Sequence, residues 1–103
     1  MTEYVLHPQA YTDLDAIWEF IAAENLDTAD RVLDEIYEAI RGRVVFPQQG
    51  QRRPDLTSRP LRFYLVRQYL IAYAPDDRPL VVVAVLHGRR SPRVMAAILR
   101  GRE

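Results

Sequence analysis

The chain has 103 residues, 49% of them hydrophobic, and no cysteine. This composition indicates one folded domain, 1–103, and excludes disulfides and thiolate chemistry. The net charge is zero, but residues 1–40 carry ten acidic residues and one arginine, whereas residues 41–103 carry thirteen arginines and four acidic residues. This asymmetry predicts an anionic partner for the basic part. No signal sequence or membrane span of about 20 apolar residues is evident, so we expect a cytoplasmic protein with no membrane partner.

The first predicted elements are a short strand over residues 4–7 and two helices. Pro8 begins the first helix, whose apolar stripe recurs at spacings of three and four: Ala10, Leu14, Ile17, Trp18 and Ile21. Asp27 or Thr28 is the expected N-cap of the second helix. Its buried stripe is Ala29, Val32, Leu33, Ile36 and Ile40. A short connection between two amphipathic helices predicts an antiparallel helical hairpin.

The hydrophobic period changes after the polar loop 47–60. Residues 61–66 and 69–73 alternate as strands do, with Arg67-Gln68 as the turn between them. Residues 80–86 are continuously apolar, which is typical of a central strand covered on both faces. A short helix over residues 94–99, capped by Ser91, ends the chain. The order β-α-α-β-β-β-(α) predicts an α+β fold, a helical hairpin packed on a small, largely antiparallel sheet.

The most concentrated polar feature is His87-Gly88-Arg89-Arg90, at the end of the central strand. Arg62, on a neighbouring strand, is expected to converge on it if the register allows. A histidine beside arginines suits RNA cleavage, because arginine stabilises an anionic transition state while histidine transfers a proton at neutral pH. Alternatively the arginines are solvated turn residues and the histidine only ends a strand. The pattern alone favours this second interpretation, because a lone His-Arg cluster is a weak motif.

Other candidate residues are weaker. Arg52-Arg53 and Arg59 either extend a basic surface or are ordinary loop charges. Strand packing is a more common role than base stacking for at least two of the three strand tyrosines, Tyr64, Tyr69 and Tyr73. No Cys/His cluster, glycine-rich phosphate loop or Ser-His-Asp pattern is present, so we expect no metal and no other cofactor.

Segments in one fixed order resemble the RelE/ParE toxin superfamily: Ala10 to Ile21, Ala29 to Leu33, Phe46 to Gly50, Leu61-Arg62 with Tyr69 to Tyr73, and Val85 to Arg90. The resemblance covers nearly the whole chain. It implies a toxin of a type II toxin–antitoxin module, held by a cognate antitoxin (ParD-like or similar) in a hetero-oligomeric complex. ParE-like members of this superfamily inhibit DNA gyrase, whereas RelE-like members cleave mRNA on the ribosome.

The resemblance is stronger to the ParE branch. RelE-type nucleases commonly use lysines and a late tyrosine or histidine, whereas this chain has no lysine and no tyrosine after Tyr73. The Asp-Leu-Asp-Ala-Ile-Trp helix and the His-Gly-Arg-Arg segment also look more like ParE. On this interpretation the protein inhibits DNA gyrase without chemistry of its own and binds its target through Arg62, Arg89, Arg90 and Arg93. The alternative is a ribosome-dependent mRNA endonuclease with catalytic residues His87, Arg62, Arg89 and Arg90. A non-toxic scaffold kept only for its partner is a third hypothesis.

The same resemblance, together with the helical hairpin, predicts where the antitoxin binds. We expect apolar grooves beside the sheet edge and four residues: Leu14, Trp18, Ile21 and Leu33. An amphipathic partner segment would fill a groove or add a strand. The arginines around His87 would attract acidic residues of the antitoxin, so binding should weaken with salt.

Overall fold

The structure is a computed structural model that describes residues 3–103. It contains one four-stranded sheet with the strand order β1-β4-β3-β2. Strands β2, β3 and β4 are antiparallel neighbours, whereas β1 runs parallel to β4. The strands are β1 (Tyr4–Leu6), β2 (Arg62–Val66), β3 (Tyr69–Ala74) and β4 (Leu80–His87). The predicted α+β fold and its order of elements are confirmed.

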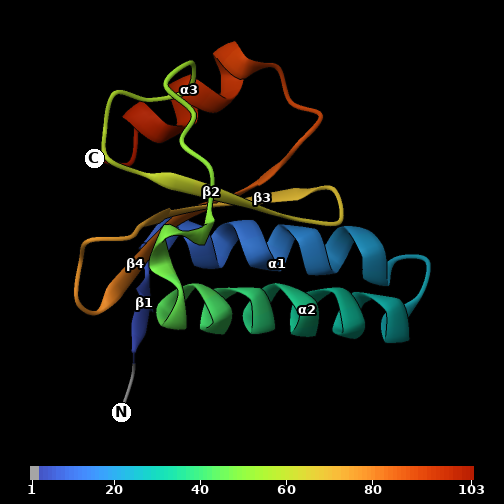
Figure 1. Ribbon diagram of the computed structural model, residues 1–103. Helices are drawn as coiled ribbons and strands as arrows, with labels where there is room; N and C mark the ends of the chain where they lie inside the picture. Colours follow the sequence, from blue (N-terminus) through green and yellow to red (C-terminus); the bar gives the residue numbers. More distant parts are fainter. Residues whose placement is uncertain (1–2) are drawn as a thin grey trace.

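Helices cover both faces of the sheet. Figure 1 shows two helices side by side on one face, and the third helix with the loop before β2 on the other. The helices are α1 (Pro8–Ala22), α2 (Leu26–Val45), the 3-10 turn η1 (Pro47–Gln49) and α3 (Pro92–Arg100). Within residues 3–103, none of them combines the length and the apolar character that crossing a membrane requires.

Side-chain caps explain where the helices begin. Pro8 opens α1, and His7 caps it by accepting a hydrogen bond at Nδ1 from the N–H of Gln9. The prediction that Asp27 or Thr28 caps α2 is wrong. Asn25 is the cap, because its extended backbone lets Oδ1 accept the N–H of Thr28 at 2.9 Å and the helix then starts at once. Ser91 caps α3 as predicted.

Strand β4 is buried on both faces, as its sequence predicts. Its Leu80, Val82 and Val85 pack in the core under α1 and α2. On the other face, three of its residues pack in the core under α3: Val83, Ala84 and Leu86. An irregularity in the β3–β4 pairing, where Val83 is extra, places Val83 and Ala84 on the same face. It therefore turns Val85 toward the helical hairpin, and His87, two residues further, turns with it.

An ion pair fixes the β2–β3 hairpin on α2. Arg67, in the two-residue turn, has a φ of 54° and donates two hydrogen bonds to the carboxylate of Glu35, each of 2.8 Å. These hydrogen bonds from Arg67 lower the pKa of Glu35 below its ordinary value. Both side chains are solvent-exposed, so the pair mainly orients the turn.

Candidate functional site

The segment after β4 forms a tight cationic turn. The Nδ1 atom of His87 accepts the N–H of Arg89 at 3.1 Å, and the carbonyl of His87 accepts the N–H of Arg90 at 3.1 Å. Arg89 and Arg90 are both exposed, and Arg93, three residues further on at the start of α3, is exposed as well. Three of the four predicted target-binding arginines therefore lie in one short exposed segment.

His87 also borders a small concave surface on the helical-hairpin side of the sheet. Its ring packs edge-on against Tyr69, with the ring centroids 5.5 Å apart. A hollow of about 180 Å³, which we call the Phe20 hollow, is lined by Asp13, Ala16, Ile17, Phe20, Tyr69, Val85, His87 and Arg90. Phe20 itself is 72% exposed. The hollow thus combines an apolar floor with an exposed aromatic ring and an exposed arginine.

The expectation that Arg62 converges on His87 is wrong. Arg62 begins β2 and pairs with Tyr73, which in turn pairs with Val82 of β4. His87 pairs with Tyr69, at the opposite end of β3. Four residues of β3, from Tyr69 to Tyr73, separate the two pairings, which corresponds to about 13 Å along the sheet at about 3.3 Å per strand residue. Arg62 instead donates a hydrogen bond from Nη1 to the carbonyl of Gly50, at 2.8 Å.

The loop arginines are partly occupied by local contacts. Arg53 forms a two-point ion pair with Asp55, with N–O distances of 3.0 and 2.9 Å, and this hydrogen bonding lowers the pKa of Asp55. Arg59 donates to the carbonyl of Leu99 at 3.3 Å and so fixes the loop on α3. The side chain of Arg52 is exposed. These contacts favour the interpretation of Arg53 and Arg59 as structural residues of the loop.

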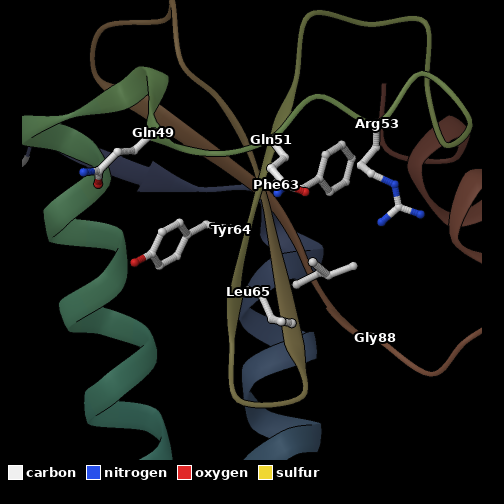
Figure 2. A pocket seen from close by; sticks show the side chains of 8 residues that line it. Gln49, Gln51, Arg53, Phe63, Tyr64, Leu65 and Gly88 are labelled. Carbon is white, nitrogen blue, oxygen red and sulfur yellow. The ribbon is translucent and has the colours of Figure 1, made fainter.

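A second concave surface follows the outer edge of β2. We call it the β2-edge groove; its volume is about 500 Å³ and it is lined by Gln49, Gln51, Arg53, Phe63, Tyr64, Leu65, Leu70 and Gly88. Figure 2 shows Tyr64 and Gln49 on the α2 side of the strand, and Phe63 and Arg53 on the α3 side. None of these described lining residues is a histidine, aspartate or glutamate. The groove therefore lacks the residue type that the endonuclease hypothesis uses for proton transfer.

The four predicted antitoxin-binding residues differ in their exposure. Leu14 is 2% exposed and packs in the core, so it does not form part of a surface groove. Ile21 and Leu33 are half-buried at the margin of that core. Trp18 is 36% exposed, and its indole N–H donates to Asp30 of α2 at 2.9 Å. The last three remain available on the hairpin surface.

A tyrosine groove at the β1 edge was missed in the sequence. It has a volume of about 620 Å³ and is lined by Tyr4, Val5, Leu6, Tyr11 and Tyr37. Burial raises the pKa of Tyr37. Only the spacing of three tyrosines at helix and strand positions hints at it. Phe20 was missed as well. Its position outside the apolar stripe of its helix is the sequence signal that predicts an exposed side chain.

Within residues 3–103, no three histidine, aspartate or glutamate side chains lie close enough to hold a metal ion together. No curated protein sequence gives a match to the chain. The chain does match the family described as "ParE toxin of type II toxin-antitoxin system, parDE", over residues 4–92. The match includes both helices of the hairpin, the whole sheet and the His-Gly-Arg-Arg turn. The chain therefore belongs to the ParE toxin family of type II toxin–antitoxin systems.

Proposed function

We propose that this toxin inhibits DNA gyrase by docking on it and performs no chemistry of its own. The observation that carries the proposal is the separation of His87 from Arg62 across the sheet. A nuclease site needs its proton-transfer group and its transition-state cations within hydrogen-bond reach of one phosphate. Here Arg62 lies at the opposite end of the sheet, and Arg90 is the predicted catalytic arginine that lines the hollow beside His87. The Nδ1 atom of His87 already accepts a backbone N–H.

The Phe20 hollow has the composition of a protein-docking surface. Aromatic and arginine side chains carry much of the binding energy at protein interfaces, with apolar floors around them. Phe20 supplies the aromatic anchor, while Arg90, Arg89 and Arg93 supply positive charge nearby. This arrangement suits an acidic, partly apolar surface of the target, and we place the gyrase contact here.

Membership of the family implies a cognate antitoxin. We propose that this antitoxin covers the exposed hairpin surface at Trp18, Ile21 and Leu33 and that its acidic residues also reach the arginine turn. On this proposal the affinity of the complex falls as ionic strength rises. An affinity that stays constant between low and high salt would contradict it. Action on gyrase places the toxin in the cytoplasm.

A supercoiling assay with gyrase, relaxed plasmid and purified toxin freed of antitoxin tests the proposal. We expect supercoiling to be blocked, or gyrase-dependent DNA breaks to appear. Phe20→Ala should weaken inhibition by about tenfold, as loss of an interface anchor does. Phe46→Ala is the matched control, because Phe46 is also exposed (58%) but lies at the end of α2. It should leave inhibition unchanged.

The alternative function predicts a different result in a parallel assay. Untouched gyrase, together with mRNA cleavage in a translating ribosome mixture, would overturn the proposal in favour of an endonuclease. Equal loss of inhibition in the Phe20 and Phe46 variants would leave gyrase as the target but reject the Phe20 hollow as the docking surface.

A further inference from the structure

The edge of β4 beyond β1 is closed by two side chains in place of a strand. β1 pairs only with residues 80–82 of β4, because the chain then enters α1. Further along, the carboxylate of Asp13 accepts the N–H of Val85 at 2.9 Å, and the guanidinium of Arg102 donates to the carbonyl of Val83 at 3.2 Å. An exposed row of unpaired backbone groups is thereby avoided at this edge.

Asp13 and Arg102 also form a two-point ion pair. The Nη2 of Arg102 donates to Oδ1 of Asp13 at 2.8 Å, and Nη1 donates to Oδ2 of the same carboxylate. The side chain of Arg102 is only 10% exposed, and that of Asp13 only 15%. Removal of either partner from such a shielded pair leaves the charge of the other uncompensated. The pair joins the last turn of the chain to the start of α1.

Asp13 is in addition part of the Phe20 hollow. Among the described residues that line this hollow, it is the only acidic one. An uncompensated carboxylate there would repel an acidic group of a partner and would oppose the attraction exerted by Arg90. Arg102 does not itself line the hollow, but its guanidinium donates to both oxygens of this carboxylate and so compensates the charge.

We propose that Arg102 is a positioning residue of the docking surface. It cancels the charge of Asp13, so that the hollow accepts an acidic side chain of the target protein, and it holds α1 against β4 beside the arginine turn. The proposal rests on the proposed docking function of the hollow. It assigns a role to a residue that lies outside the family match of residues 4–92.

The test compares Arg102→Gln with Arg100→Gln. Arg100 has the same charge, lies two residues earlier and is exposed at the end of α3. Arg102→Gln should weaken gyrase inhibition by about tenfold or more, because like charges then face each other across the interface. Arg100→Gln should weaken inhibition by less than about twofold, the small effect of a distant exposed charge. Equal effects of the two variants would overturn the proposal.

Two further variants separate positioning from folding. In Asp13→Asn/Arg102→Gln the amide oxygen can still accept the N–H of Val85, and the repelling charge is gone. We expect this double variant to recover most of the inhibition that Arg102→Gln loses. Arg102→Lys, which keeps the charge, should be intermediate. A double variant as weak as Arg102→Gln, at equal melting temperature, would overturn the proposal.

The salt dependence provides a readout that a purely structural role would not change. Inhibition by wild-type protein should weaken as salt rises, whereas inhibition by Arg102→Gln should depend less on salt.

Growth arrest on induction is measured for the same variants. If wild-type protein arrests growth but leaves gyrase untouched, the gyrase proposal fails and the growth data alone decide the role of Arg102. A wild-type chain that is inert in both assays would overturn both proposals.

Discussion

Tyr73 and Gly50 share a buried hydrogen bond that joins the sheet to the loop after α2. The phenol oxygen of Tyr73 accepts the N–H of Gly50 at 2.9 Å and donates to the carbonyl of Pro47 at 2.7 Å. Tyr73 is fully buried, in β3. The contact therefore joins both ends of η1 to the sheet.

The first prediction concerns the absence of a side chain at Gly50. A Cβ at this position would lie 2.5 Å from the phenol oxygen of Tyr73 and 3.0 Å from the carbonyl oxygen of Phe63. Gly50→Ala should therefore lower the free energy of unfolding by about 1–3 kcal/mol, the usual effect of overpacking. The measurement is urea unfolding followed by far-UV circular dichroism.

Gly42 provides the control for this variant. It lies inside α2, and a Cβ there would meet nothing within 4 Å. Gly42→Ala should raise the free energy of unfolding by about 0.5–1 kcal/mol, since alanine loses less backbone entropy in a helix. If both alanine variants are stabilised, the contact with Tyr73 is not tight and the interpretation of Gly50 is wrong.

The second prediction concerns the phenol itself. Tyr73→Phe leaves the N–H of Gly50 and the carbonyl of Pro47 without this partner, so at pH 7 it should lower the free energy of unfolding by about 1–3 kcal/mol. Burial raises the pKa of Tyr73 above its ordinary value of 10.0. The folded chain therefore binds the phenolic proton more tightly than the unfolded chain does.

This difference predicts how stability changes at alkaline pH. The contribution is fully present below about pH 10, the pKa of an unfolded tyrosine, and is lost as the pH rises through the higher pKa of the folded state. The gap between wild type and Tyr73→Phe should narrow above pH 10. Part of the alkaline loss should persist in the variant, because burial also raises the pKa of Tyr37. A gap that stays constant to pH 11.5 would contradict the assignment.

The sequence predicts the elements well but not how distant residues meet. The apolar run 80–86 correctly indicates a strand covered on both faces. The two-residue turn at Arg67-Gln68 already implies that Arg62, far from the turn, cannot lie beside His87. The shift at Val83 that turns His87 toward α1 leaves no trace in a segment that is apolar at every position from 80 to 86.

The Asp13–Arg102 pair lies beyond sequence reasoning for a different reason. The two residues are 89 positions apart, and thirteen arginines in the second part of the chain compete for ten acids in the first. Charge alone cannot select one pair among so many. The end of β1 at Leu6 leaves the N–H of Val85 on the β4 edge without a strand partner, and the carboxylate of Asp13 accepts it.

The third prediction addresses His87 directly. In His87→Asn the side-chain amide can still accept the N–H of Arg89, but it cannot transfer a proton at neutral pH. A docking role predicts a loss of growth arrest of less than about tenfold, the effect of one ordinary interface residue. Loss of a general acid or base would instead lower the rate of RNA cleavage by about 10²–10⁴-fold. A loss of that size at unchanged melting temperature would support the endonuclease. His7→Asn is the control, since it should still cap α1.

The last prediction concerns a buried arginine whose hydrogen-bonding capacity is not fully used within the described residues. Arg43 is 7% exposed, and its Nε and Nη1 atoms have no hydrogen-bond acceptor within the described residues. Its guanidinium stacks on Tyr64, with Cζ 3.6 Å from the ring centroid. Such a cation–π contact is worth about 0.5–2 kcal/mol, whereas burial of an ion costs several kcal/mol. The balance predicts that Arg43 destabilises the fold.

Arg43→Met should therefore raise the free energy of unfolding by about 1 kcal/mol, because a thioether of similar length packs well on an aromatic ring and carries no charge. Arg41→Met, two residues earlier on the exposed side of α2, is the control and should change stability little. Thermal unfolding of the three proteins at neutral pH decides the matter. If Arg43→Met melts lower than both wild type and Arg41→Met, the stacked cation stabilises the fold and this assessment of its burial is wrong.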